Sequence, residues 1–125
     1  MTTHEVADRL VALCREGKFK EATNELYAHD IVSVEAVAPP NGSREMHGLE
    51  AVKGKGEWWE ANHEVHSLKV EGPVVAGHHF AVAFLMNVTS KPMGKRFDMH
   101  EIALYKIANG KVVHEEFFYH TPSQA

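Results

Sequence analysis

Two stretches near the C-terminus, residues 97–107 and 112–119, constrain this chain most, because both are rich in apolar and aromatic residues and the pair Asn109-Gly110 lies between them. Asn-Gly between alternating apolar stretches is the strongest short-range signal for a β-hairpin. Glu101 and Glu115 lie inside these stretches. A carboxylate among apolar side chains is costly to bury unless it is paired, and such groups often serve a function. The sequence therefore predicts a hairpin that carries acids into a pocket.

The length of the hairpin loop determines which acids share a face of the sheet. A two-residue turn at Asn109-Gly110 would place Glu101 on the same face as Glu116. A three-residue loop that ends at Gly110 would place Glu101 with Glu115, and this arrangement separates charged from apolar side chains better. We adopt the three-residue loop, which pairs Glu101 with Phe117 and makes the two acids diagonal neighbours, about 7–8 Å apart at the backbone.

The opposite face of the hairpin combines charged side chains with three large apolar ones, Ile102, Leu104 and Phe118. An apolar patch of this size on a charged face is typical of a surface that another protein covers. We therefore expect a homodimer through the outer face of the sheet.

Elements before the hairpin are predicted from helical and strand periodicity. Thr2 and Glu5 form a capping box before the first helix, and Gly17 ends it. Trp59 and His63 belong to the inner stripe of the third helix. The predicted helices are 3–16, 19–28 and 49–62, and the predicted strands are 31–37, 64–71, 74–75, 80–89, 97–107 and 112–119. Helices followed by an antiparallel meander indicate an α+β fold.

Composition limits the function classes. A chain of 125 residues with 44% hydrophobic residues predicts one globular domain, residues 1–125. The net charge of −4 and the lack of a basic run argue against nucleic acid as a partner. We see no signal peptide and no membrane span, and the single cysteine fits a reducing compartment, so a cytoplasmic location is expected.

The ten histidines raise the question of a metal site. His63 and His66 lie close in sequence, but no third ligand follows at a recognisable spacing. We therefore expect no metal and no cofactor. His63 remains a candidate base or hydrogen-bond donor in the pocket.

Three short segments give the chain a family resemblance: residues 26–30 (Leu-Tyr-Ala-His-Asp), residues 48–52 (Gly-Leu-Glu-Ala-Val) and residues 109–113 (Asn-Gly-Lys-Val-Val). With the order of the elements, they resemble a SnoaL-like member of the nuclear transport factor 2-like superfamily. The resemblance implies a cone-shaped, curved antiparallel sheet wrapped around three N-terminal helices and a deep apolar pocket. Relatives include ketosteroid isomerases and polyketide cyclases, as well as non-enzymatic binders, and many are dimers.

The resemblance assigns roles to single positions. Glu101 matches an isomerase acid that donates to a developing oxyanion, and Tyr119 matches a pocket aromatic residue. The isomerases also have a proton-shuttling Asp at the end of the first strand. The matching position in this chain is Ala36, with Glu35 beside it on the opposite face. The cyclases have an Asp in the last strand, and the nearest matching position in this chain is Phe117. The resemblance therefore implies a pocket with one oxyanion-type acid and an incomplete catalytic set.

Our hypothesis is a cofactor-free acid–base enzyme, of isomerase, cyclase or dehydratase type, that acts on a small, largely apolar carbonyl compound. Glu101 would transfer the proton, with Glu115 or His63 as its partner. The alternative is a domain without catalysis that binds a small hydrophobic or aromatic molecule or dimerises. Strand alternation and helical spacing predict the pocket walls, which are Tyr27, Trp59, Phe84, Met86, Met99, Phe117 and Tyr119.

Overall fold

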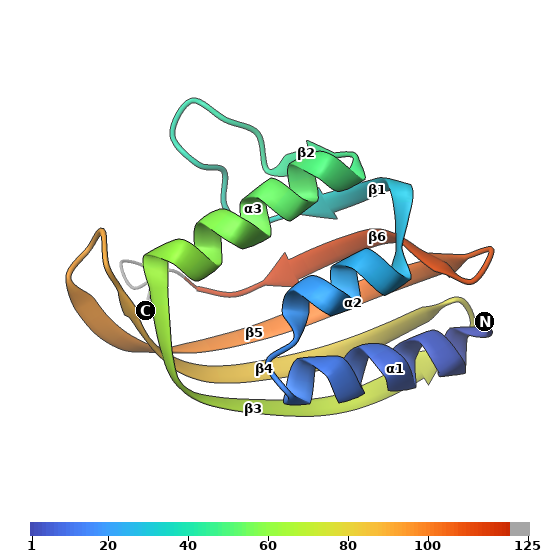
Figure 1. Cartoon of the computed structure of the whole chain (residues 1–125). Coiled ribbons are helices and arrows are strands. Elements are labelled where there is room, and N and C mark those ends of the chain that lie inside the picture. The colour runs from blue at the N-terminus through green and yellow to red at the C-terminus, as the bar shows by residue number, and fades with distance from the viewer. Residues whose placement is uncertain (121–125) are drawn as a thin grey trace.

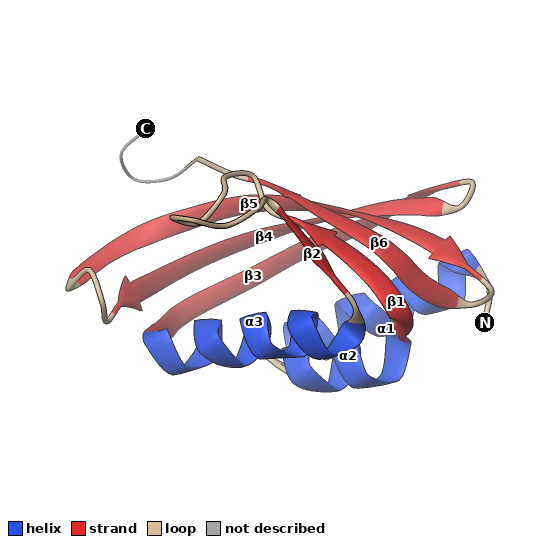
Figure 2. Cartoon of the chain, turned by 90° about the horizontal axis from the view of Figure 1, so that it is seen from above, coloured by secondary structure: helices blue, strands red, loops and turns tan. Residues whose placement is uncertain are grey.

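The structure is a computed structural model that describes residues 1–120. Its helices and strands are, in chain order, α1 Thr3–Arg15, α2 Phe19–Leu26, β1 Tyr27–Val34, β2 Glu45–His47, α3 Leu49–Asn62, β3 His63–Ala76, β4 His79–Ser90, β5 Lys95–Ala108 and β6 Lys111–Phe118. The three helices lie on one face of a curved sheet, and no helix of residues 1–120 lies on the opposite face (Figures 1 and 2). This arrangement confirms the α+β fold with a curved sheet wrapped around three helices.

The first helix forms as its sequence predicts. The Thr2 hydroxyl accepts a hydrogen bond from the Glu5 backbone, and the Glu5 carboxylate accepts one from the Thr2 backbone, which completes a capping box. The helix buries one apolar stripe, and the core lies between this stripe and strands β4 and β5. The core side chains exposed by no more than 1% include Val6, Leu10, Val11, Leu26, Ile31, Phe80, Val82, Val88 and Val112. Within residues 1–120, no helix has the length and apolar character needed to cross a bilayer.

The sheet has six strands in the order β2-β1-β6-β5-β4-β3. All neighbouring pairs are antiparallel except β1 and β6, which are parallel, so the sheet is mixed where we expected an antiparallel one. This pairing joins the first long strand to the last, and no local signal in the sequence marks such a distant partner. The short strand β2, which the sequence did not predict, pairs with β1 at the outer edge.

The C-terminal hairpin corrects the predicted loop. Asn109 and Gly110 have φ values of 52° and 73°, as a two-residue type I′ turn requires. A β-bulge leaves Val113 without a cross-strand partner, and it shifts the register of β6 by one residue. The bulge therefore produces the face partition that we attributed to a three-residue loop.

The bulge also changes which residues face one another. Glu115 pairs with Tyr105, and Phe117 pairs with Ala103, so Glu101 is not opposite Phe117. Glu101 and Glu115 are thus four residues apart along the ladder, about 13 Å at the backbone. The predicted diagonal contact between the two acids is therefore wrong, although Glu115 faces inward and is 2% exposed.

Candidate active site

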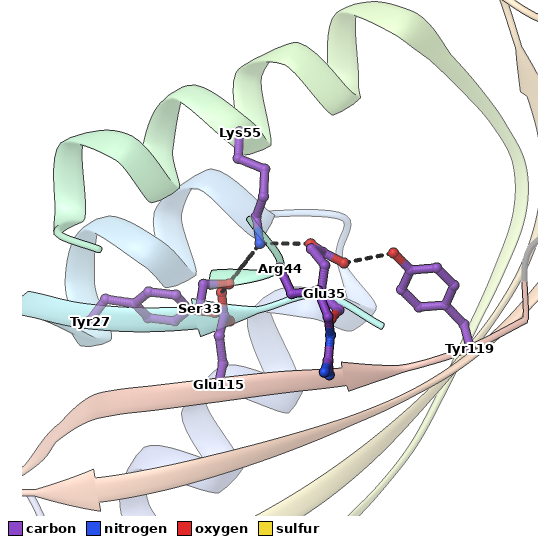
Figure 3. Close-up of polar contacts among 7 residues, drawn as sticks. All are labelled: Tyr27, Ser33, Glu35, Arg44, Lys55, Glu115 and Tyr119. Carbon is purple, nitrogen blue, oxygen red and sulfur yellow. Dashed lines mark hydrogen bonds and ion pairs between the residues drawn. The ribbon is translucent and has the colours of Figure 1, made fainter. Parts of the chain in front are cut away.

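A group of hydrogen-bonded polar side chains lies between α3, β1 and β6 (Figure 3). Ser33 and Glu35 alternate with residues of the opposite face at the end of β1, so both point toward the helices. Lys55 extends from the middle of α3 toward both of them. Glu115 comes from β6, which runs beside β1.

Glu115 forms the most deeply buried part of this group. The Ser33 hydroxyl donates to Oε2 of Glu115 at 2.7 Å, and the Tyr27 hydroxyl donates to Oε1. The Lys55 Nζ lies 4.0 Å from Oε2. Burial raises the pKa of Glu115, while the Lys55 charge and the two hydroxyl donors act in the opposite direction. Both carboxylate oxygens thus have donors inside the protein.

Lys55 and Glu35 form the second part. The Lys55 Nζ donates to Glu35 Oε1 at 2.7 Å and to the Ser33 hydroxyl at 2.6 Å. The Tyr119 hydroxyl donates to Glu35 Oε2 at 2.9 Å, so Glu35 also has a donor on each oxygen. Burial, followed by the Glu35 charge, raises the pKa of Tyr119. The ammonium group lies 5.0 Å from the ring centre of Phe117, within the range of a cation–π interaction.

Glu101 differs from the other two acids. It pairs across the sheet with Phe84, and no described residue donates a hydrogen bond to its carboxyl group. Every fully buried side-chain nitrogen or oxygen in residues 1–120 has a partner, so the Glu101 oxygens must be accessible to solvent. Burial raises the pKa of Glu101 to about 8, with smaller contributions from the charges of Glu35 and Glu115. Glu101 therefore holds its proton to higher pH than an ordinary glutamate does.

The predicted wall residues fall into three groups. Phe84 and Met86 are buried in the core beneath the inner face, while Trp59, Met99 and Phe117 are partly buried and pack against that core. The other two predicted wall residues, Tyr27 and Tyr119, belong to the polar group and hydrogen-bond Glu115 and Glu35.

The contacts of His63 are with Trp58 and Trp59 and not with the polar group. Its ring stacks on Trp59 with centroids 4.4 Å apart, and its Nδ1 lies 2.9 Å from the Trp59 carbonyl oxygen. Trp58 contacts the same ring edge-on and is 58% exposed. These interactions fix His63 at the end of α3, where the chain enters β3.

Sequence reasoning missed three members of the polar group: Ser33, Glu35 and Lys55. It placed Ala36 at the position of the isomerase base and Glu35 on the opposite face, whereas the Glu35 carboxylate points inward to Lys55 and Tyr119. The alternation of Ile31, Ser33 and Glu35 carried the signal, since Ile31 and Ser33 are fully buried. An acid is therefore present at the end of β1.

The described residues offer little for a metal ion. No group of three His, Cys, Asp or Glu side chains in residues 1–120 is arranged to hold one. The arrangement offers a carboxyl group with a raised pKa and no hydrogen-bond donor among residues 1–120, and a second carboxyl group paired with an ammonium group. General acid–base catalysis combines an acid and a base of these kinds.

Comparison with known proteins connects this arrangement to a family. The model of the SnoaL-like domain matches residues 1–119. A crystal structure from Mesorhizobium loti, provisionally named a SnoaL-like polyketide cyclase and carbohydrate phosphatase, is 42% identical with a TM-score of 0.90; the match covers 95% of this chain and 100% of that chain. No curated protein matches the chain.

Two more distant structures show the fold alone. A nuclear transport factor 2-like protein of unknown function from Burkholderia pseudomallei is 16% identical with a TM-score of 0.77, and the match covers 98% of this chain and 95% of that chain. A protein with a ketosteroid isomerase-like fold from Catenulispora acidiphila, in complex with trimethylamine, is 21% identical with a TM-score of 0.65. That match covers 82% of this chain and 75% of the other.

Proposed function

Because the chain belongs to the SnoaL-like domain family, we propose that it is a cofactor-free acid–base enzyme, of isomerase, cyclase or dehydratase type, acting on a small, largely apolar carbonyl compound. The observation that carries the proposal is Glu101, a carboxyl group with a pKa of about 8 and no hydrogen-bond donor among residues 1–120. Such a group is available to a ligand as a proton donor at neutral pH.

Each acid has a distinct role in the proposed reaction. Glu101 donates its proton toward the carbonyl oxygen as negative charge develops there. Glu35 removes a proton from the carbon next to the carbonyl, which gives the enol, a protonated Glu35 and a Glu101 carboxylate. Return of the Glu35 proton to another carbon, with return of the enol O–H proton to Glu101, would complete an isomerisation and restore both acids. Glu115 is less suited to the base role because its side chain is 2% exposed, whereas the Glu35 side chain is 27% exposed. His63 contacts Trp59 at the end of α3 and, within residues 1–120, forms no hydrogen bond with the polar group.

The ligand would contact Glu101 with its polar end and the partly buried apolar side chains with the rest. Trp59, Met99 and Phe117 supply this apolar surface above the buried Phe84 and Met86. Binding sites for small molecules combine such apolar walls with a few polar groups in the same way.

The test is exchange of the α-protons of small ketones in D₂O, followed by ¹H NMR. This assay needs no knowledge of the natural substrate, because removal of an α-proton is the step assigned to Glu35. A panel of cyclic and aryl ketones should show exchange that Glu101→Gln and Glu35→Gln each slow by about 10²-fold or more. Glu64→Gln, an exposed acid on β3, is the control and should exchange at the native rate.

The second candidate function is binding without chemistry. It is favoured by Glu115 and Glu35, whose oxygens all have protein donors. In that case no ketone would exchange faster than in buffer, and Glu101→Gln would change ligand affinity only modestly. The exchange assay thus separates the two candidates.

We also propose a homodimer through the outer face of the sheet. Ile102, Leu104 and Phe118 are 54%, 39% and 47% exposed, and Ile102 lies directly opposite Phe118. Three large apolar side chains together on an exposed sheet face favour association with a second copy.

A further inference from the structure

Gly56 leaves a bare stretch of backbone on the inner face of α3. Val52, four residues before it, is buried, and Trp59, three residues after it, packs against the core. Residues three and four apart share one face of a helix, so Gly56 belongs to the inner face as well. Apart from its chain neighbours and the backbone of α3, no heavy atom of residues 1–120 lies within 4 Å of the position that a Cβ atom would take there. The space beneath α3 is therefore open at this point.

The side chains next to Gly56 are directed away from this open space. The Lys55 side chain extends to the Glu35 carboxylate (Figure 3). The Trp59 ring stacks on His63, which lies one turn further along the chain. Gly56 is thus bordered by an ion pair at the preceding residue and by two stacked rings in the next turn.

An aromatic ring of the sheet lies near the same part of the helix. The Lys55 ammonium group is 5.0 Å from the ring centre of Phe117 on β6. Phe117 packs against the core but is only partly buried. The bare backbone of α3 and an accessible aromatic ring on the sheet therefore lie close to the same ammonium group.

Neither the backbone nor the packing of α3 requires glycine at position 56. The residue lies inside the helix, in a conformation that alanine adopts readily, and an alanine methyl group would meet no neighbour there. Glycine in a helix interior is destabilising relative to alanine. Gly54 shares these properties, but it lies on the opposite, exposed face of α3. A ligand that contacts the helix backbone would account for the glycine on the inner face.

We propose that Gly56 is a specificity-determining residue, at which the backbone of α3 contacts the ring face of a planar aryl or cyclic ketone. A helix surface without a Cβ atom lets a planar ring approach the peptide groups closely and brings many atoms into van der Waals contact. Trp59 and Phe117 supply aromatic surface beside it. This inference rests on the proposed function for the reaction, and it adds the shape of the substrate.

The test is the binding of two methyl ketones with equal numbers of carbon atoms: 2-acetylnaphthalene, which is planar, and 1-adamantyl methyl ketone, which is globular. A ¹H–¹⁵N NMR titration gives the Kd for native chain, for Gly56→Ala and for the matched control Gly54→Ala. We expect native chain to bind the planar ketone more tightly than the globular one. Gly56→Ala should weaken binding of the planar ketone by about tenfold or more, because the added methyl group overpacks the contact. Gly54→Ala should change this Kd by less than about twofold.

Both alanine variants should melt about 2–4 °C above native chain, because alanine favours a helix interior over glycine. A loss of affinity in Gly56→Ala is then a local effect on the ligand contact and not a loss of fold. The proposal is overturned if Gly56→Ala binds the planar ketone as native chain does, or if Gly54→Ala weakens binding equally. It is also overturned if the globular ketone binds as tightly as the planar one, if neither binds, or if Gly56→Ala lowers the melting temperature.

The binding test is separate from the test of the enzyme function. Binding of the planar ketone that depends on Gly56, without exchange of its α-protons, would refute the enzyme function and leave this inference intact. Exchange that Gly56→Ala does not affect, with no preference for the planar ketone, would support the enzyme function and overturn this inference.

Discussion

Replacing Glu101 by glutamine should stabilise the folded chain at neutral and alkaline pH. Burial raises the pKa of Glu101 from an ordinary value of 4.5 to about 8. The unfolded chain therefore releases this proton more readily than the folded chain does. The cost to folding is absent below pH 4.5, grows as the pH rises, and is complete above about pH 8. Glutamine has nearly the shape of the protonated acid and cannot ionise, so this cost to folding is absent.

The size of the effect follows from the pKa difference. A difference of one between the pKa in the folded chain and the pKa in the unfolded chain corresponds to about 1.4 kcal/mol. Glutamine at position 101 should thus raise the free energy of unfolding by about 3 kcal/mol at pH 7 and about 5 kcal/mol above pH 8. With an unfolding entropy of about 2.1 cal/mol/K per residue, the gain at pH 7 is an increase of about 12 °C in melting temperature.

The assay is thermal unfolding followed by circular dichroism from pH 4 to pH 9. It compares the native chain with Glu101→Gln and with the control Glu64→Gln. The difference between native chain and Glu101→Gln should be small at pH 4 and should widen steadily toward pH 8. The control should follow native chain at every pH. Equal melting temperatures of the native chain and Glu101→Gln at pH 8.5 would refute the argument that the folded chain raises the pKa of Glu101.

Three further predictions concern other parts of the molecule. Tyr27→Phe removes a donor from buried Glu115 and should lower the free energy of unfolding by about 1.5–3 kcal/mol in urea denaturation; an unchanged midpoint would contradict the role of this hydrogen bond. Ile102→Asp should convert a dimer into a monomer in light scattering, and a native chain that is already monomeric at all concentrations would rule out the dimer. In a thermal-shift screen of small carbonyl and phenolic compounds, Trp59→Ala should reduce the shifts seen with native chain; if no compound shifts native chain, or if Trp59→Ala leaves every shift intact, the pocket proposal fails.

The hairpin shows which features local sequence patterns can predict and which they cannot. The Asn109-Gly110 turn and the two flanking strands follow from residue type alone. The bulge at Val113 does not, because Val is ordinary in a regular strand and nothing in its neighbours marks an interruption. The alternation of apolar and charged side chains still identified the correct faces for residues 114–118, because the buried face must be apolar whether a loop or a bulge sets the register. It wrongly placed Val113 on the inner face, where the structure has Val112.

The candidate active site was harder to predict because it combines distant segments. Glu101 stood out as an acid within an apolar strand. Lys55 lies between two glycines on a helix with few buried residues, a context in which a lysine normally faces solvent. Its partner Glu35 comes from the end of β1, and the two meet because α3 crosses over that strand. Helical spacing and strand alternation describe each segment separately and carry no information on this contact.

The most direct test of the central claim is the titration of the Glu101 carboxyl group in native chain, followed by ¹³C NMR and assigned with Glu101→Gln. The structure predicts a midpoint near pH 8, so that Glu101 carries its proton at neutral pH and can donate it to a ligand. A midpoint near the ordinary value of 4.5 would contradict the account. Glu101 would then be ionised at neutral pH, and the proposed acid–base pair would lack its acid.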